Sequence, residues 1–190
     1  MKPDELGGII AFLQAAERLK FTFRSSWTSS GDRESVAAHT WRLCLLALLL
    51  ADHFPEVDFA RLARILIVHD LGEALHGDVP ATQQDGTPDK AARERHDLLQ
   101  LIVPLPGKLQ REITELWDEY EAALTPEARL AKGLDKLETI IQHNQGRNPA
   151  GFDYRFNLDY GRRLTTSDPR LAVLRALVDA ETMRRAEAAE

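Results

Sequence analysis

Apolar residues along most of the chain recur at three- and four-residue steps, the spacing that predicts amphipathic helices. One helix is expected from about Asp4 to Lys20, with Asp4 as its cap, and a second begins at the capping residue Ser35. A third is expected from about Asp58 to His76, where Gly77 stops it. The alternating pattern that would predict a β-strand is not found anywhere in the sequence.

The second half of the chain has the same helical pattern, interrupted by segments rich in proline and glycine. Helices are predicted from Thr87-Pro88 to about Val103, from Lys108 to about Leu124, from Thr125-Pro126 onward, and from Asp168-Pro169 to about Arg185. The polar segment from Thr82 to Asp89 is expected to form a loop that could serve as a lid. Residues 144–160 are expected to form an irregular loop with a short helix near Tyr160. The predicted fold class is all-α, a compact single-domain bundle of about six to eight helices.

Within the third predicted helix, the apolar run that starts at Ile65 changes abruptly into imidazole and carboxylate groups. His69 and Glu73 continue the inward stripe of Leu66 at steps of three and four residues. Asp70 lies about 100° around the helix from His69, so a metal ion above the groove between them could be reached by both. The structural alternative is a buried histidine that pairs with a neighbouring acid.

The second predicted helix also carries a histidine, His39, on its apolar face with Val36 and Leu43. Alone, such a histidine would be interpreted as a core residue with satisfied hydrogen bonds. A second inward-facing histidine on another helix changes that interpretation, because two imidazoles from neighbouring helices can share one metal ion.

Two aspartates are further candidates whose structural alternatives stay open. Asp135 lies at the border of the apolar stripe in the helix that opens at Thr125, and it could simply pair with a lysine such as Lys132. Asp78 follows Gly77 and could be only a turn former.

Composition narrows the class of protein. The 190 residues suit one domain, 1–190, and no apolar run approaches the roughly 18 residues of a membrane span. With 24 basic and 30 acidic residues, the net charge of −6 argues against binding a nucleic-acid polymer. Cys44 is the single cysteine, so nitrogen and oxygen atoms must hold any metal. The acidic N-terminus lacks the basic region of a secretory signal, and the expected location is cytoplasmic.

Taken together, His39, His69-Asp70 and Asp135 give the order His, His-Asp, Asp. In a helical chain of this size, that order resembles the HD superfamily of metal-dependent phosphohydrolases, over roughly 21–142. Finer motifs resemble the HD-domain 5′-deoxynucleotidases. They are Arg24 placed 15 residues before His39, Glu-Ser-Val-Ala-Ala-His at 34–39, His-Asp-Leu-Gly-Glu at 69–73 and Gly-Asp-Val-Pro at 77–80.

The resemblance implies a role for each matching residue. His39, His69, Asp70 and Asp135 would hold one divalent metal ion, for which Mn, Co, Fe, Ni and Mg all suit two nitrogen and two oxygen ligands. Arg24 would bind the phosphate, Glu73 would act in catalysis, and Asp78 would accept a hydrogen bond from the sugar hydroxyl. Trp27 is the candidate aromatic residue for the substrate, and a homodimer is expected.

Two positions depart from the family pattern. Ala38 stands where relatives usually have a glutamate that would complete a capping box with Ser35. Ser25 directly follows Arg24, where bacterial relatives place a tryptophan, and Trp27 comes two residues later, as in other branches.

The leading hypothesis is hydrolysis of deoxynucleoside 5′-monophosphates to deoxynucleoside and phosphate. Such hydrolysis needs neutralised phosphoryl oxygens, a positioned water and a protonated leaving group, which the metal, Arg24 and Glu73 would supply. A second hypothesis changes the substrate to another phosphomonoester or a nucleotide polyphosphate, which should need more cationic residues near the pocket than Arg24 alone. A third is a non-catalytic, metal-stabilised module that binds a nucleotide or a partner, against which Glu73 argues.

Overall fold

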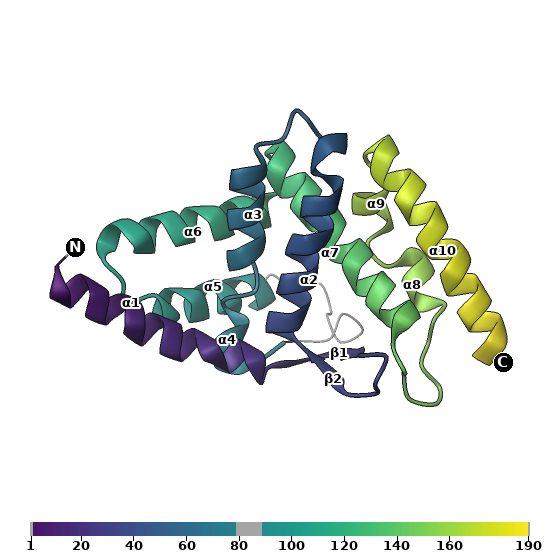
Figure 1. The fold of residues 1–190 in the computed structure, drawn as a ribbon, viewed down its shortest axis with the longest axis horizontal. Helices are drawn as coiled ribbons and strands as arrows, with labels where there is room; N and C mark the ends of the chain where they lie inside the picture. The colour runs from purple at the N-terminus through teal and green to yellow at the C-terminus, as the bar shows by residue number, and fades with distance from the viewer. Residues whose placement is uncertain (1, 79–88, 190) are drawn as a thin grey trace.

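The computed structural model describes residues 2–78 and 89–189, which form helices and one small hairpin (Figure 1). The helices of ten or more residues are α1 (Pro3–Ala16), α2 (Val36–Leu50), α3 (Phe59–Val68), α5 (Asp89–Leu101), α6 (Gly107–Ala122), α7 (Pro126–Gln145) and α10 (Pro169–Ala189). Shorter ones are α4 (Glu73–His76), α8 (Phe156–Asp159), α9 (Arg162–Thr165) and the 3₁₀ turns η1 (Glu17–Lys20) and η2 (Ala51–His53). The all-α prediction is confirmed, whereas the single domain over 1–190 stays a prediction.

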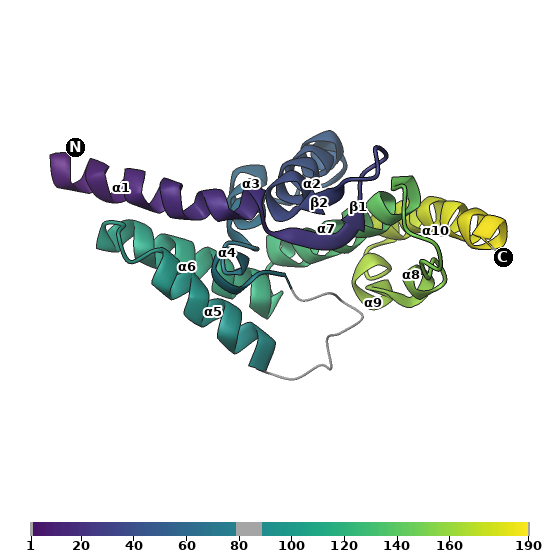
Figure 2. The same cartoon turned by 90° about the horizontal axis from the view of Figure 1, so that it is seen from below.

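Helix α7 lies at the centre of the arrangement. The α2–α3 pair packs on one side of it and α10 on the other, and α5 and α6 pack side by side with α1 along α5 (Figures 1 and 2). Leu134 and Leu137 of α7 are fully buried, as are Leu43 of α2 and Leu66 of α3. Among the described residues, no helix is both long and apolar enough to cross a membrane.

The helix starts follow the capping residues of the sequence in most cases. Ser35 caps α2 by accepting a hydrogen bond from the Ala38 amide at 3.2 Å, and Thr125 caps α7 in the same way. The predicted cap at Asp4 is wrong, because α1 already begins at Pro3, the first-turn position that proline favours. The Thr87-Pro88 cap and the predicted lid over residues 82–88 lie outside the described residues.

The predicted helix from Asp58 to His76 is interrupted. Asp58 caps α3 as expected, but α3 ends at Val68, and residues 69–72 form a turn before α4. The Glu73 amide bonds the Asp70 carbonyl at 3.0 Å, three residues back, so the chain winds more tightly here than an α-helix. Gly77, with a positive φ of 89°, ends α4 as predicted.

The structure also contains two short strands that no alternating pattern in the sequence had indicated. Strands β1 (Phe23–Trp27) and β2 (Arg33–Ser35) form an antiparallel hairpin in which Phe23 pairs with Ser35. The two strands are only five and three residues long, and apolar and polar residues do not alternate along them, so the sequence lacks the period-2 signal. The hairpin contacts α7 through β1 and α2 through β2, which brings Arg24 over the central helix.

Candidate functional site

Two histidines from different helices face each other in the core. His39 of α2 is fully buried and His69, directly after α3, is nearly so, with ring centroids 5.7 Å apart. His69 Nδ1 donates to the Leu66 carbonyl at 2.7 Å, and His39 Nδ1 lies 2.5 Å from Glu138 Oε2. The Nε2 atoms of both rings are buried without a hydrogen-bond partner among the described residues. Each ring is therefore fixed through Nδ1, and Nε2 is left for another ligand.

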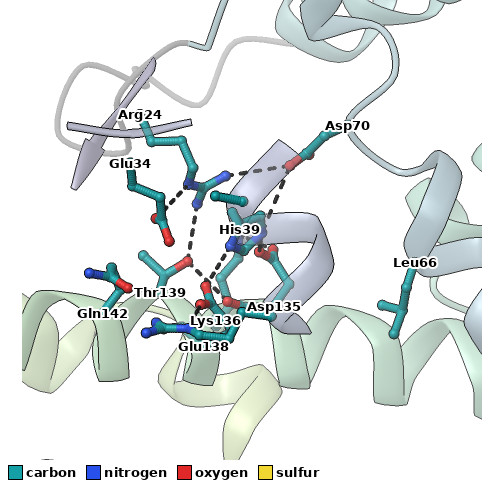
Figure 3. A network of polar contacts seen from close by, with 12 residues as sticks. Arg24, Glu34, His39, Leu66, Asp70, Asp135, Lys136, Glu138, Thr139 and Gln142 are labelled. Atoms are coloured by element: carbon teal, nitrogen blue, oxygen red, sulfur yellow. Dashed lines mark hydrogen bonds and ion pairs between the residues drawn. The ribbon is translucent and has the colours of Figure 1, made fainter. Parts of the chain in front are cut away.

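Two carboxylates complete this cluster. Asp70 Oδ2 lies 3.1 Å from His69 Nε2. It also lies 3.8 Å from His39 Nε2, and Asp135 Oδ1 of α7 lies 3.2 Å from the same nitrogen (Figure 3). The structure thus brings together all four residues that the sequence singled out as metal ligands. His39, His69 and Asp70 lie close enough to one another to hold a metal ion, and Asp135 adds a second carboxylate beside His39, so the cluster offers nitrogen and oxygen donors that fit a divalent cation.

The charges in the cluster also favour a bound cation. Burial would raise the pKa of Asp70, but His69 and Arg24 outweigh it and hold that pKa well below its ordinary value. Burial and Arg24 lower the pKa of His39, yet Glu138 and Asp135 outweigh them and raise it to about 9. At neutral pH the metal-free cluster therefore keeps ionised carboxylates beside a protonated imidazole, and a bound cation would replace that proton.

Glu73, at the start of α4, is buried, and its Oε2 has no hydrogen-bond partner among the described residues. Burial, followed by the negative charges of Asp70 and Asp78, raises the pKa of Glu73 to about 10. In the absence of a cation this carboxyl group carries a proton at neutral pH. Asp78 is half-buried just after Gly77 and is close enough for its charge to act on Glu73.

Arg24 of β1 extends over the same cluster. Its guanidinium donates to Asp70 Oδ2 at 3.4 Å and to Thr139 Oγ1 at 3.1 Å, while its Nε lies 3.9 Å from Glu34 Oε2 (Figure 3). Nε itself has no hydrogen-bond partner among the described residues. Further along the hairpin, the Trp27 carbonyl accepts from Gln142, so Trp27 lies beyond Arg24 along α7.

Sequence reasoning assigned no role to Glu138, which supports the cluster from behind. One of its oxygens contacts His39 Nδ1, and the other accepts from Arg42 Nε at 2.5 Å. Glu34, His39 and Glu138 also lie close enough to hold a metal ion by distance alone. Because Arg42 already bonds Glu138, we interpret this second group as support for His39. The available signal was its place three residues after Asp135 on one helix face.

Other histidines and lysines have separate partners. His76 Nδ1 lies 2.6 Å from Asp97, and His143 Nδ1 lies 2.9 Å from Asn157. The lysine bound to Asp135 is its neighbour Lys136, at 2.9 Å, whereas Lys132, the pairing partner named from the sequence, bonds Glu121. Asp135 therefore pairs with a lysine and faces His39 at once, through different oxygens.

The chain matches the HD domain family over residues 16–173, and it belongs to that family. The 5′-deoxynucleotidase hdd1 of Schizosaccharomyces pombe is 37% identical over 140 residues, which cover 70% of each chain. The 5′-deoxynucleotidase HDDC2 of Bos taurus is 34% identical over 139 residues, which cover 72% of this chain and 67% of the relative.

Solved structures resemble the whole arrangement. A predicted metal-dependent phosphohydrolase from Magnetospirillum magnetotacticum superposes with a TM-score of 0.81 at 32% identity, covering 96% of this chain and 98% of the other. A conserved hypothetical protein from Pyrococcus furiosus gives a TM-score of 0.61 at 31% identity, covering 92% of this chain and 99% of the other. These matches confirm the HD-domain fold expected from the sequence.

Proposed function

We propose that this protein is a metal-dependent 5′-deoxynucleotidase, which hydrolyses deoxynucleoside 5′-monophosphates to deoxynucleoside and phosphate. The observation that carries the proposal is the meeting of His39, His69, Asp70 and Asp135 beneath the guanidinium of Arg24. The curated relatives named above, both 5′-deoxynucleotidases, support the same reaction.

In this proposal the two histidines and two aspartates hold one divalent ion, which supplies Lewis-acid polarisation of the phosphate and of a water molecule. Arg24 offers a forked pair of N–H donors to the phosphate oxygens, close to Asp70. Glu73 orients the attacking water and transfers a proton to the departing 5′-oxygen. Its side chain is buried one turn after Asp70, which places it beside the proposed metal ligands.

Substrate selection is assigned to Asp78 and Trp27. Asp78 would accept a hydrogen bond from the 3′-hydroxyl, in a site too tight for a 2′-hydroxyl, which would favour deoxyribose. Trp27 would contact the nucleobase, and its ring is supported edge-on by Phe152 at a centroid distance of 6.4 Å.

The test is phosphate release from a panel of deoxy- and ribonucleoside monophosphates. Chelated enzyme is reloaded with Mn²⁺, Co²⁺ or Mg²⁺, and each substrate is repeated with the Asp70→Ala variant. We expect metal-dependent turnover of deoxynucleotides, weak turnover of ribonucleotides and loss of both in the variant. If no monophosphate releases phosphate, but nucleoside triphosphates added to the panel release pyrophosphate or triphosphate, a polyphosphate substrate is favoured instead.

We also propose that the protein forms the homodimer that the family resemblance implies. Large apolar side chains repeat along one exposed face of α2: Trp41, Leu45, Leu48 and Leu49. Light scattering should give the mass of a dimer for the wild type and of a monomer for Trp41→Glu. Leu13→Glu, at an exposed apolar position of α1, is the control.

The cytoplasmic location stays a prediction from the sequence.

A further inference from the structure

Tyr120 contacts two of the four proposed metal ligands from α6, a helix to which sequence reasoning assigned no site residue. Its side chain is buried, and its hydroxyl donates to Asp135 Oδ2 at 2.9 Å. Its ring lies 5.1 Å from the His69 ring, centroid to centroid.

The two oxygens of Asp135 have different surroundings. Oδ2 accepts from the Tyr120 hydroxyl and from Lys136 Nζ, both at 2.9 Å, whereas Oδ1 lies 3.2 Å from His39 Nε2. The terminal torsion of an aspartate is broad, so nothing in the side chain itself selects one oxygen. The two hydrogen bonds to Oδ2 fix the orientation of the carboxylate, because rotating it would break both of them.

We propose that Tyr120 is a positioning residue of the metal centre. Its hydroxyl, together with Lys136, holds Asp135 so that a single oxygen, Oδ1, faces the cation, and its ring limits the movement of His69. This inference rests on the metal site proposed above.

Both histidine ligands are held by comparable contacts. Glu138 fixes His39 through Nδ1, and the Leu66 carbonyl fixes His69 through Nδ1. Outer contacts of this kind typically change metal affinity by about 10- to 100-fold when they are removed. Tyr120 completes the pattern for Asp135 and makes the position of that ligand depend on how α6 packs against α7.

A purely structural role for Tyr120 would have a different consequence. A buried hydroxyl needs a hydrogen-bond partner, and Asp135 could be that partner without any effect on metal binding. Removing the hydroxyl would then change the stability of the metal-free protein and leave its metal affinity unchanged. Metal affinity is therefore the measurement that separates the two roles.

The experiment titrates chelated full-length protein with Co²⁺, followed by visible absorption and by competition with a chelator. We expect Tyr120→Phe to raise the Kd for Co²⁺ by about tenfold and to alter the Co²⁺ spectrum. Tyr154→Phe, which removes a hydroxyl that accepts from Asn148, is the matched control and should resemble the wild type. A Kd for Tyr120→Phe within twofold of the wild-type value would overturn the proposal.

A double-mutant cycle tests whether Tyr120 acts through Asp135. In the Asp135→Ala background, Tyr120→Phe should leave the remaining Co²⁺ affinity unchanged. An equal loss in both backgrounds would show that the effect does not pass through Asp135 and would overturn the assignment. If the wild-type protein binds no Co²⁺, both the proposed metal centre and this inference are wrong. Wild-type protein that binds Co²⁺ but releases no phosphate would overturn only the proposed reaction.

Discussion

The carboxyl group of Glu73 is buried in α4, and its raised pKa has a consequence for stability. The unfolded chain loses this proton near pH 4.5, whereas the folded, metal-free protein keeps it until about pH 10. Between these values the folded state binds more protons, so this group makes the protein less stable as the pH rises.

Glu73→Gln should therefore stabilise the chelated protein while it abolishes the proposed catalysis. The gain should be below about 1 kcal/mol at pH 5 and grow by up to about 1.4 kcal/mol for each pH unit toward pH 8, because the amide carries no charge to bury. Urea unfolding across this pH range measures it, with Glu115→Gln at an exposed position of α6 as the control. A gain that does not grow with pH would contradict the interpretation of Glu73.

At the scale of elements, the turn over residues 69–72 depends on close packing between the start of α4 and α5. A Cβ atom on Gly72 would lie 2.4 Å from the Glu94 carbonyl oxygen, and the φ of Gly72, −60°, is open to any residue. The reason for glycine at this position is therefore the space between two backbones, and a backbone cannot rotate away as a side chain can.

Gly72→Ala should force α4 and α5 apart. We expect a loss of about 1–3 kcal/mol in the free energy of unfolding and a lower kcat, because the turn joins Asp70 to Glu73. Gly7→Ala in α1 is the matched control, since nothing lies within 4 Å of its added Cβ. That control should gain up to about 1 kcal/mol from helix propensity. A similar gain for Gly72→Ala would contradict the packing argument.

The elements that could be predicted from the sequence are those whose signals are local. Ser35 and Thr125 mark the starts of their helices, because each caps a backbone amide three residues later. The inward positions of His39 and His69 follow from the periodicity of the apolar residues. The break after Val68 could not be predicted, because no local signal marks it and the close approach of α5 to Gly72 is known only from the packing.

The supporting residues of the site escaped prediction for the same reason. Glu138 contacts His39 across 99 positions of the sequence, and Tyr120 meets Asp135 from another helix. An acid or a tyrosine on a helix face gives no signal of such a partner until the packing of α7 against its neighbours is known. The ligand order was recognisable only because it matches a family pattern.

Across the whole molecule, the proposed metal ion would connect α2, the turn after α3, and α7, which pack against one another in the core. A cation that binds only the folded protein stabilises it by about 2.7 kcal/mol at a concentration 100 times its Kd. Because His39 has a pKa of about 9 without metal, the cation must displace a proton at neutral pH.

The rise in melting temperature caused by Mn²⁺ or Co²⁺ should therefore grow with pH. Between pH 6 and 8 each unit should raise the apparent affinity by about tenfold, which corresponds to about 1.4 kcal/mol of added stabilisation by the metal. The same proton explains both sides of the comparison: the metal-free protein loses the stabilisation from protonated His39 as the pH rises from about 6.5 to about 9, whereas the metal-bound protein has no such proton to lose. Thermal unfolding with and without metal at pH 6, 7 and 8 measures the trend, and Asp70→Ala should show little response to metal. A metal-induced shift that is the same at all three pH values would show that no proton is exchanged and would contradict the raised pKa of His39 in the metal-free protein.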